Sequence, residues 1–222
     1  LLSNLNLSIV DAFFESMSGI TTTGSTIITN LDNAPKGILM WRAILQWLGG
    51  IGIIVMAIAI LPLLRVGGMQ LFRMESSDQS EKALPRAAQI ASAIGGIYFV
   101  VTGIWAFGYW LSGMSGFEAL VHAMTTIATG GFSTSDASIG HFDSAAVDYL
   151  AAAGMVVGAL PFLLYLKTLQ GGWGTLARDS QVQCFLSVVV ILILMTTLWL
   201  WQGNDVPLEQ AVRLATVNLV SI

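Results

Sequence analysis

Charged residues are scarce in this chain, and their scarcity restricts both its environment and its partners. Only 10% of the 222 residues are Asp, Glu, Lys or Arg, whereas 55% are hydrophobic and the mean hydropathy is +0.76. Soluble domains usually contain about 25% charged residues. The formal net charge is -4, and no basic run suits a nucleic acid. The composition therefore excludes a soluble domain and predicts an integral membrane protein in contact with the lipid bilayer.

Cysteine and histidine are too few to support the common kinds of site chemistry. The lone Cys184 begins an apolar stretch, so no intrachain disulfide can form. His122 and His141 are too isolated to make a metal site. An intramembrane hydrolase would need a serine nucleophile with a histidine base, and Ser133 and Ser135 follow His122, but no motif marks either serine as a nucleophile. We expect neither enzyme activity nor a bound cofactor, and hydrolysis is a remote alternative.

Four apolar stretches are long enough to cross a bilayer as helices, which takes about 20 residues for roughly 30 Å of hydrocarbon. They are residues 38–64, 87–111, 149–169 and 184–201. Two further apolar segments, near 9–19 and 116–127, are too short to cross. Non-helical backbone at membrane depth is tolerated only when it is buried in protein or lines a watery cavity. We therefore predict that these two segments are re-entrant helices.

The distribution of basic residues predicts the orientation of the spans. The connections that follow the first and third spans carry most of the bases, so both are predicted to be cytoplasmic. These bases are Arg65, Arg73, Lys82, Arg86, Lys167 and Arg178. The connection between 111 and 149 has no base but contains Glu118, Asp136, Asp143 and Asp148. Such carboxylates either form an outer vestibule that concentrates cations or simply solvate a loop.

The two short helices belong to a repeat with a fixed offset of 107 residues. Identical residues recur at this offset, as at Ala12 and Ala119, Met17 and Met124, Ile20 and Ile127, Thr22 and Thr129, and Gly24 and Gly131. Both copies begin with a serine and have a carboxylate three residues later, Ser8 with Asp11 and Ser115 with Glu118. A serine N-cap followed by an acid in the first turn is typical of a helix start. Each copy is therefore predicted to be a capped helix that leads into a glycine-containing loop.

Three motifs carry a family resemblance over essentially the whole chain. They are residues 14–19 before the first Thr/Gly loop, residues 41–52 with the sequence WRAILQWLGGIG, and residues 128–134 with the sequence ATGGFST. Together they resemble the Trk/Ktr superfamily of potassium uptake proteins, TrkH type. The resemblance implies an all-α, K⁺-channel-like integral membrane fold, in which four membrane-pore-membrane units with re-entrant pore helices surround one pore.

The resemblance also implies a division of the chain into units. Residues 1–64 would be the end of the second unit, 65–86 a cytoplasmic linker, 87–178 the complete third unit and 179–222 the start of the fourth. Pro207 and Glu209 supply helix-start chemistry in the last part. We therefore expect the chain to be a piece of a longer protein with at least three such units.

The Thr/Gly loops have the composition of a cation filter. Backbone carbonyls can replace the hydration shell of K⁺ where glycine permits unusual dihedral angles. The ends of the re-entrant helices direct partial negative charge toward the ion. We expect K⁺ to be bound by backbone carbonyls only, in filter loops made by Thr22, Thr23, Gly24 and Ser25 and by Thr129, Gly130, Gly131 and Phe132. A single such string is common in ordinary turns, so the prediction depends on its duplication.

The third span contains a predicted break. Pro161 removes a backbone donor and clashes with the preceding turn. One interpretation is a kinked helix whose glycines pack on a neighbour. The resemblance instead implies a gate beneath the filter, made by Gly154, Gly158, Ala159, Leu160 and Pro161. Lys167 either snorkels to the inner surface or faces the pore near this gate.

Two features of the first span have structural interpretations. Gly49, Gly50 and Gly52 are predicted to allow close helix approach, without contacting the ion. Arg42 lies near the outer end of this span, where we expect it to meet a loop carboxylate or a lipid headgroup.

The resemblance finally implies a function and partners. It implies K⁺ uptake across the bacterial inner (plasma) membrane by a multi-pass homodimer, regulated by a cytoplasmic nucleotide-binding subunit of TrkA type. A Na⁺-conducting or Na⁺-coupled relative is the alternative, because the first and fourth filter loops lie outside these residues. Gly24 and Gly131 favour K⁺, and these residues do not distinguish a channel from a coupled transporter.

Overall fold

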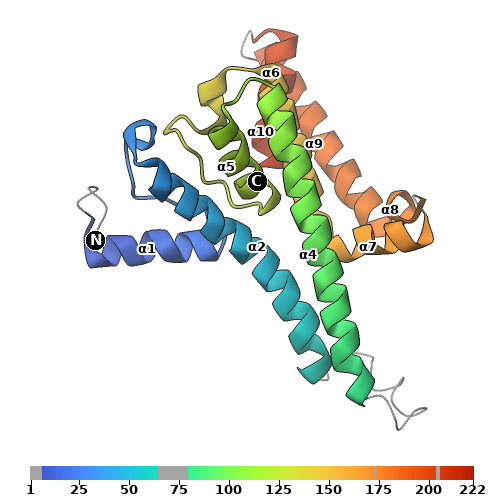
Figure 1. Cartoon of the computed structure of the whole chain (residues 1–222). Coiled ribbons are helices and arrows are strands. Elements are labelled where there is room, and N and C mark those ends of the chain that lie inside the picture. Colours follow the sequence, from blue (N-terminus) through green and yellow to red (C-terminus); the bar gives the residue numbers. More distant parts are fainter. Residues whose placement is uncertain (1–6, 65–79, 173, 204–205) are drawn as a thin grey trace.

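The computed structural model describes residues 7–64, 80–172, 174–203 and 206–222, which form helices joined by loops, with no strand in these ranges (Figure 1). The helices are α1 (Ile9–Ile20), α2 (Lys36–Leu64), α4 (Ser80–Leu111), α5 (Gly116–Ile127), α6 (Ala145–Ala159), α7 (Phe162–Gly171), α8 (Gly174–Arg178), α9 (Ser180–Gly203) and α10 (Leu208–Val220), with 3-10 turns η1 (Leu31–Asn33) and η2 (Ser138–Phe142). Most of the predicted linker 65–86 lies outside the described residues, and α4 already begins at Ser80.

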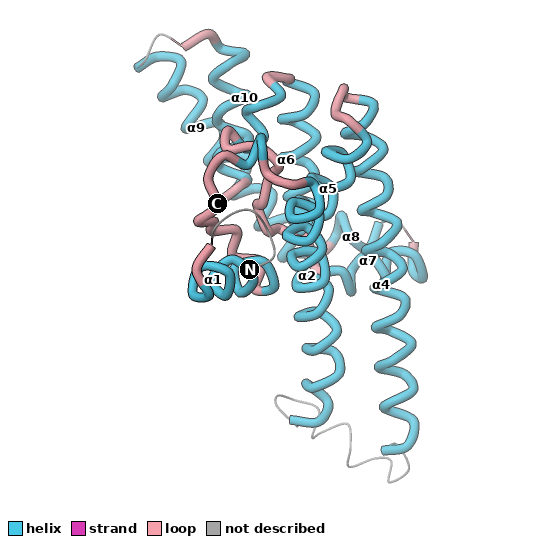
Figure 2. Tube along the Cα trace, turned by 60° about the vertical axis from the view of Figure 1, so that its left-hand side comes forward, coloured by secondary structure: helices cyan, strands magenta, loops and turns pink. Residues whose placement is uncertain are grey.

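The long helices agree with the predicted spans. Among the described residues, Gln89–Leu111 and Ser180–Gly203 are long and apolar enough to cross a membrane. The predicted third span consists of α6 and α7, which are bent by 84° at a short break and give a third span if they are counted as one. The predicted first span coincides with the 29 residues of α2. The lower halves of α2 and α4 extend beyond the rest of the molecule (Figure 2).

The two short helices α1 and α5 have the predicted length and the predicted start. Each has 12 residues, which corresponds to about 18 Å and is too short to cross the hydrocarbon. Ser8 and Asp11 form a complete capping box, and so do Ser115 and Glu118. In each box the serine hydroxyl accepts from the backbone N–H of the acid, while the carboxylate accepts from the N–H of the serine.

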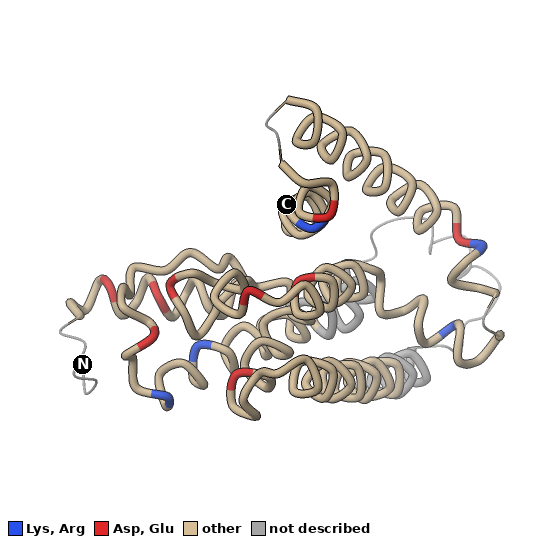
Figure 3. The backbone as a smooth tube through the Cα atoms, turned by 90° about the horizontal axis from the view of Figure 1, so that it is seen from above, with Lys and Arg blue, Asp and Glu red and all other residues tan. Residues whose placement is uncertain are grey.

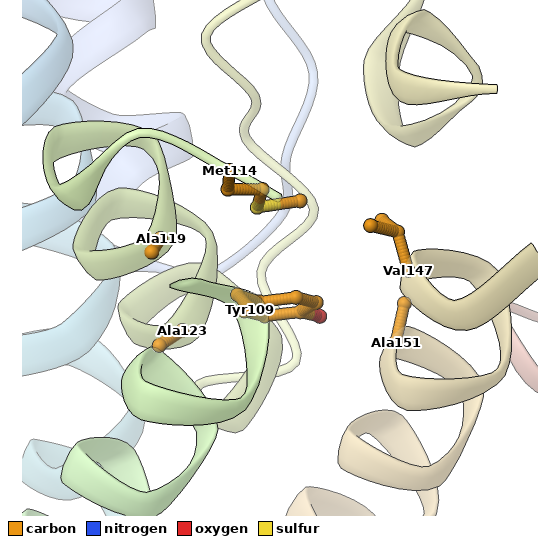
Figure 4. Packing of buried hydrophobic residues seen from close by; sticks show 6 residues of the cluster. All are labelled: Tyr109, Met114, Ala119, Ala123, Val147 and Ala151. Carbon is orange, nitrogen blue, oxygen red and sulfur yellow. The ribbon is translucent and has the colours of Figure 1, made fainter. Parts of the chain in front are cut away.

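The core lies around α5, which packs against α2, α4 and α6. Small residues on α5 let Tyr109 of α4 lie between Ala119 and Ala123 on one side and Val147 and Ala151 of α6 on the other (Figure 4). Close packing of this kind stabilises α5. It also buries the C-terminal end of the helix, where Ile127 is 1% exposed. The core therefore fixes the helix that leads into the second Thr/Gly loop.

The last two helices lie to one side of this core. α10 contacts both α9 and α6, whereas α9 leaves apolar side chains such as Val190, Ile191 and Leu194 exposed. In Figure 3, which colours the backbone by residue type, few positions along the helices are charged. An apolar, uncharged helix surface suits contact with lipid or with another apolar helix.

Candidate functional site

The two Thr/Gly loops have the same backbone conformation. Thr22 and Gly24 have φ angles of 56° and 80°, and Thr129 and Gly131 have 51° and 81°. Gly24 and Gly131 thus have the left-handed backbone that favours glycine. A β-branched threonine with positive φ is an outlier. Positive φ at Thr22 and Thr129 could therefore not be predicted from residue type.

The loops also leave their helices through the same hydrogen bonds. The N–H of Thr22 donates to the Gly19 carbonyl and that of Thr129 to the Thr126 carbonyl, each at 3.0 Å. One residue further on, the N–H of Thr23 donates to Ser18 at 3.0 Å and that of Gly130 to Thr125 at 2.9 Å. These bonds satisfy carbonyl groups that the helix ends leave free.

The structure brings the two loops together at Gly24. A Cβ atom added to Gly24 would overlap the carbonyl oxygen of Gly130. No side chain larger than hydrogen fits between the loops at this point, whatever its rotamer. Two segments 107 residues apart in sequence therefore form one site.

Gln46 of α2 holds the second loop. Its side chain is 0% exposed. Its Nε2 donates to the carbonyl oxygen of Gly130 at 2.7 Å, and its Oε1 accepts from the N–H of Phe132 at 3.1 Å. In the sequence Gln46 is one residue of the motif 41–52. No local pattern around it predicts its contacts with Gly130 and Phe132.

A hydrogen bond behind each loop is repeated at the same offset. The Thr26 hydroxyl donates to the carboxylate of Glu15, at 2.9 and 3.1 Å to its two oxygens, and Nε2 of His122 is hydrogen-bonded to the Ser133 hydroxyl at 3.0 Å. Glu15 and His122 are 107 residues apart, and so are Thr26 and Ser133. Both helices thus support the hydroxyl two residues beyond the loop glycine. The offset could have revealed these pairs, but the different chemistry of Glu and His concealed them.

Arg42 connects the two loops through Glu15. Its Nε lies 2.7 Å from Oε1 of Glu15, and its Nη1 donates to the Ser133 carbonyl at 3.2 Å. The guanidinium also lies over the Phe132 ring, 4.0 Å from its centroid. Both charged side chains are buried, at 2% and 6% exposure. The expected loop or headgroup partner was therefore wrong, because the carboxylate belongs to the helix α1.

The outer carboxylates have specific partners. Arg213 of α10 binds Asp148 at 2.6 Å and Asp143 at 2.9 Å, and Asp136 accepts from the N–H of Leu31 at 3.2 Å. Glu118 caps α5. The predicted vestibule is therefore partly neutralised by Arg213, which lies 70 residues from Asp143 in the sequence.

A contact between the outer loops involves Asp32. The N–H of Asp136 donates to the Asp32 carboxylate at 3.5 Å, and Nδ1 of His141 lies 3.7 Å from the same carboxylate. A hydrogen bond from the Ser135 hydroxyl lowers the pKa of Asp32 below its usual value. This carboxylate is exposed and stays charged at neutral pH, where it ties the two loops together.

The predicted break in the third span occurs at the expected residues. α6 ends at Ala159, and α7 begins at Phe162 after Leu160 and Pro161. The hydroxyl of Tyr165 donates to the carbonyl of Val157 at 2.8 Å, which satisfies a group that the break leaves without a helical partner. Lys167 is exposed on α7.

Glycines bring α2 against the end of α1 and α6 against the end of α5. A Cβ at Gly49 would overlap the Ile20 carbonyl, and one at Gly158 would lie 2.8 Å from the Ile127 carbonyl. A Cβ at Gly50 would lie 3.1 Å from Ala128, whereas no described atom lies within 4 Å of one at Gly52. Close approach is confirmed for Gly49 and Gly50, whereas for Gly52 it stays a prediction.

Comparison with known proteins assigns this chain to a family. A profile of the TrkH family, described as a cation transport protein, matches residues 1–212. The chain belongs to the TrkH family. It is therefore a member of a membrane transport family, and the hydrolase alternative is wrong. His122 and Ser133 do meet, but as buried supports of the loop.

Two similar curated proteins are named as potassium uptake proteins. The chain is 49% identical over 218 residues to the Trk system potassium uptake protein TrkI from Halomonas elongata, covering 97% of this chain and 44% of that protein. It is 45% identical over 202 residues to the Trk system potassium uptake protein TrkH from Escherichia coli (strain K12), covering 90% and 42%. The chain thus spans less than half the length of the curated relatives it matches.

A solved structure in the TrkH family has the same fold. The crystal structure of the potassium transporter TrkH from Vibrio parahaemolyticus matches with a TM-score of 0.85 and 38% identity, covering 98% of this chain and 44% of that chain. The all-helical fold class predicted from the sequence is confirmed by this match and by the helices described above.

Proposed function

We propose that this chain forms part of a pore for K⁺ uptake, in which the two Thr/Gly loops line part of a selectivity filter. The observation that carries the proposal is the shared backbone of the loops, with positive φ at equivalent residues and a direct meeting at Gly24 and Gly130. Loops of equivalent conformation can present equivalent carbonyl oxygens to one ion from different sides. The potassium uptake proteins to which the chain is similar support the same ion.

The proposed ligands are backbone carbonyl oxygens in residues 22–25 and 129–132. Among the described residues no group of three or more His, Cys, Asp or Glu side chains could hold a metal ion. Neutral carbonyl oxygens bind K⁺ weakly enough for it to leave. The C-terminal ends of α1 and α5 lead into the loops and add partial negative charge there. Because Gln46 already binds the Gly130 carbonyl, we assign that oxygen a part in holding the loop.

We further propose that the break between α6 and α7 gates this pore. Gly158 lies against the carbonyl end of α5, directly before the second loop. A change in the bend at Leu160 and Pro161 would therefore be transmitted to the filter through Gly158. Packing of Gly154 against Trp105 and Thr126 supports the alternative of a static kink.

Similarity to the family supports a proposal about the wider assembly. We propose a multi-pass protein of the bacterial inner membrane, with residues 1–64, 87–178 and 179–222 in three successive membrane-pore-membrane units. A second copy of the chain and a cytoplasmic nucleotide-binding subunit of TrkA type are the proposed partners. Residues 65–79 of the proposed cytoplasmic connection, 65–86, lie outside the described residues.

Ion flux into liposomes that contain the full-length protein tests the function. We expect K⁺ and Rb⁺ to enter much faster than Na⁺ under equal gradients. Preferential Na⁺ entry would favour the Na⁺-conducting alternative, and K⁺ entry only with a Na⁺ gradient would favour coupled transport. Liposomes without ion uptake would contradict the proposal.

A further inference from the structure

Gln46 is a buried polar side chain whose two hydrogen bonds both go to the second Thr/Gly loop. It lies in the middle of the apolar helix α2 and is 0% exposed. A buried amide is costly unless its donor and acceptor are both paired. Here Nε2 donates to Gly130 and Oε1 accepts from Phe132. The helix therefore carries this polar group at a position where only the loop can satisfy it.

The two bonds enclose the residue with the unusual backbone. Gly130 and Phe132 flank Gly131, whose φ is 81°. The amide thus binds the carbonyl before this residue and the N–H after it, as a neighbouring strand would. Neither peptide group can rotate without losing a hydrogen bond in a site that excludes water. Gln46 thereby fixes the orientation of the peptide groups on both sides of Gly131.

The same contact controls the distance between the loops. A Cβ at Gly130 would overlap the Gln46 amide, and a Cβ at Gly24 would overlap the Gly130 carbonyl oxygen. The Gly130 peptide therefore lies between the amide on one side and the first loop on the other. Any shift of the amide moves the oxygen that touches Gly24.

A second contact from the same face of α2 supports this position. Arg42 precedes Gln46 by four residues, so the two side chains lie on one face of the helix. Arg42 donates to the Ser133 carbonyl and lies over the Phe132 ring. The second loop is thus held at two successive points by a helix from the preceding unit.

We propose that Gln46 is a positioning residue that sets the spacing of the two loops and, through it, the discrimination of K⁺ from Na⁺. This inference rests on the proposed filter function. Discrimination by carbonyl oxygens depends on the size of the cavity or on the number and field of the ligands. Both depend on the orientation of the Gly130 and Gly131 peptides. Loss of the two Gln46 hydrogen bonds should therefore lower the K⁺/Na⁺ selectivity more than it slows K⁺ transport.

Two substitutions in the full-length protein test this role. Gln46→Leu removes both hydrogen bonds at similar volume, and Gln46→Asn keeps the amide but withdraws it by one methylene group. Gln89→Leu is the matched control, because Gln89 is exposed on α4. The readout is the K⁺/Na⁺ flux ratio in proteoliposomes at equal amounts of folded protein, together with the K⁺ flux itself.

We expect the flux ratio to fall about tenfold in both Gln46 variants, the equivalent of about 1.4 kcal/mol, which is the net size of a single hydrogen bond. K⁺ flux should persist, and the control should retain the wild-type ratio. A wild-type ratio in both Gln46 variants would overturn the proposal. So would loss of folded protein in both, because Gln46 would then be a general determinant of folding. Absence of K⁺ flux in the wild type would instead reject the proposed function.

Discussion

At the scale of single residues, Glu15 has the largest set of contacts behind the loops. Its carboxylate accepts from Arg42, from the Thr26 hydroxyl and from the N–H of Ile27. These contacts offset part of the cost of burying two charges, although Nη2 of Arg42 is buried without a hydrogen-bond partner among the described residues. If either residue is removed, the other is a buried charge without a counter-charge.

Substituting one residue of the Glu15–Arg42 pair should destabilise the protein, and substituting both should cost less than the two single changes together. We expect Glu15→Ala to lower the free energy of unfolding by about 3–5 kcal/mol, because Arg42 stays buried without a counter-charge. The double variant Glu15→Ala with Arg42→Met should lose less than the sum of the two single variants. Thermal unfolding in detergent measures all three. Additive losses would show that the two charges do not interact.

Residue type predicted the glycines of the two loops but not the side chains that hold the loops in place. Gly24 and Gly131 could be identified because positive φ favours glycine and because the repeat aligns them. Gln46 could not, since its partners lie 84 and 86 residues away and no local pattern signals a contact at that distance. The contact of Arg213 on α10 with Asp148 on α6 could not be predicted either, because it depends on the packing of the two helices.

At the scale of elements, α2 and α6 each place a glycine against the end of a short helix. Gly49 faces the Ile20 carbonyl and Gly158 faces the Ile127 carbonyl. These contacts bring backbone against backbone, so the helix approaches the loop more closely than any side chain would allow. The helix starts were predictable because capping boxes are local, whereas the depth of this approach depends on packing.

Two alanine substitutions on α2 should have effects of opposite sign. Alanine favours a helix over glycine by about 1 kcal/mol, so Gly52→Ala, which meets no described atom, should raise the free energy of unfolding by up to that amount. Gly49→Ala should lower it, because the new methyl group overlaps the Ile20 carbonyl. Thermal unfolding of the two variants decides the sign. Stabilisation by both would contradict the close approach at Gly49.

The break between α6 and α7 makes a separate prediction about gating. Deleting residues 158–161 should raise the basal ion flux, since it removes the segment that connects the bend to the second loop. Flux into liposomes without any regulator measures the effect. A flux that falls or stays constant would favour the static kink, in which Gly154 and Gly158 serve packing alone.

At the scale of the whole molecule, one site is assembled from two repeated units. The capped helix, the loop with two positive φ angles and the supported hydroxyl all recur at an offset of 107 residues. α2 of the first unit then holds the loop of the second through Arg42 and Gln46. The repeat was visible in the sequence. The contacts of α2 with the second loop were not, because the residues 107 positions after Arg42 and Gln46 are of different types.

We propose that the glycines of the two loops belong to one K⁺ filter, and the K⁺/Na⁺ flux ratio of Gly24→Ser and Gly131→Ser decides this claim. Gly113→Ser is the matched control, because Gly113 also has positive φ, at 102°, but lies outside the loops in open space. A side chain in left-handed backbone costs roughly 1–2 kcal/mol, and at Gly24 it would also overlap the Gly130 carbonyl oxygen. We expect each loop variant to lose about tenfold in selectivity, because the strain falls on the proposed ligands. The control should lose none, because its strain lies outside the loops. Wild-type ratios in both loop variants would contradict the claim.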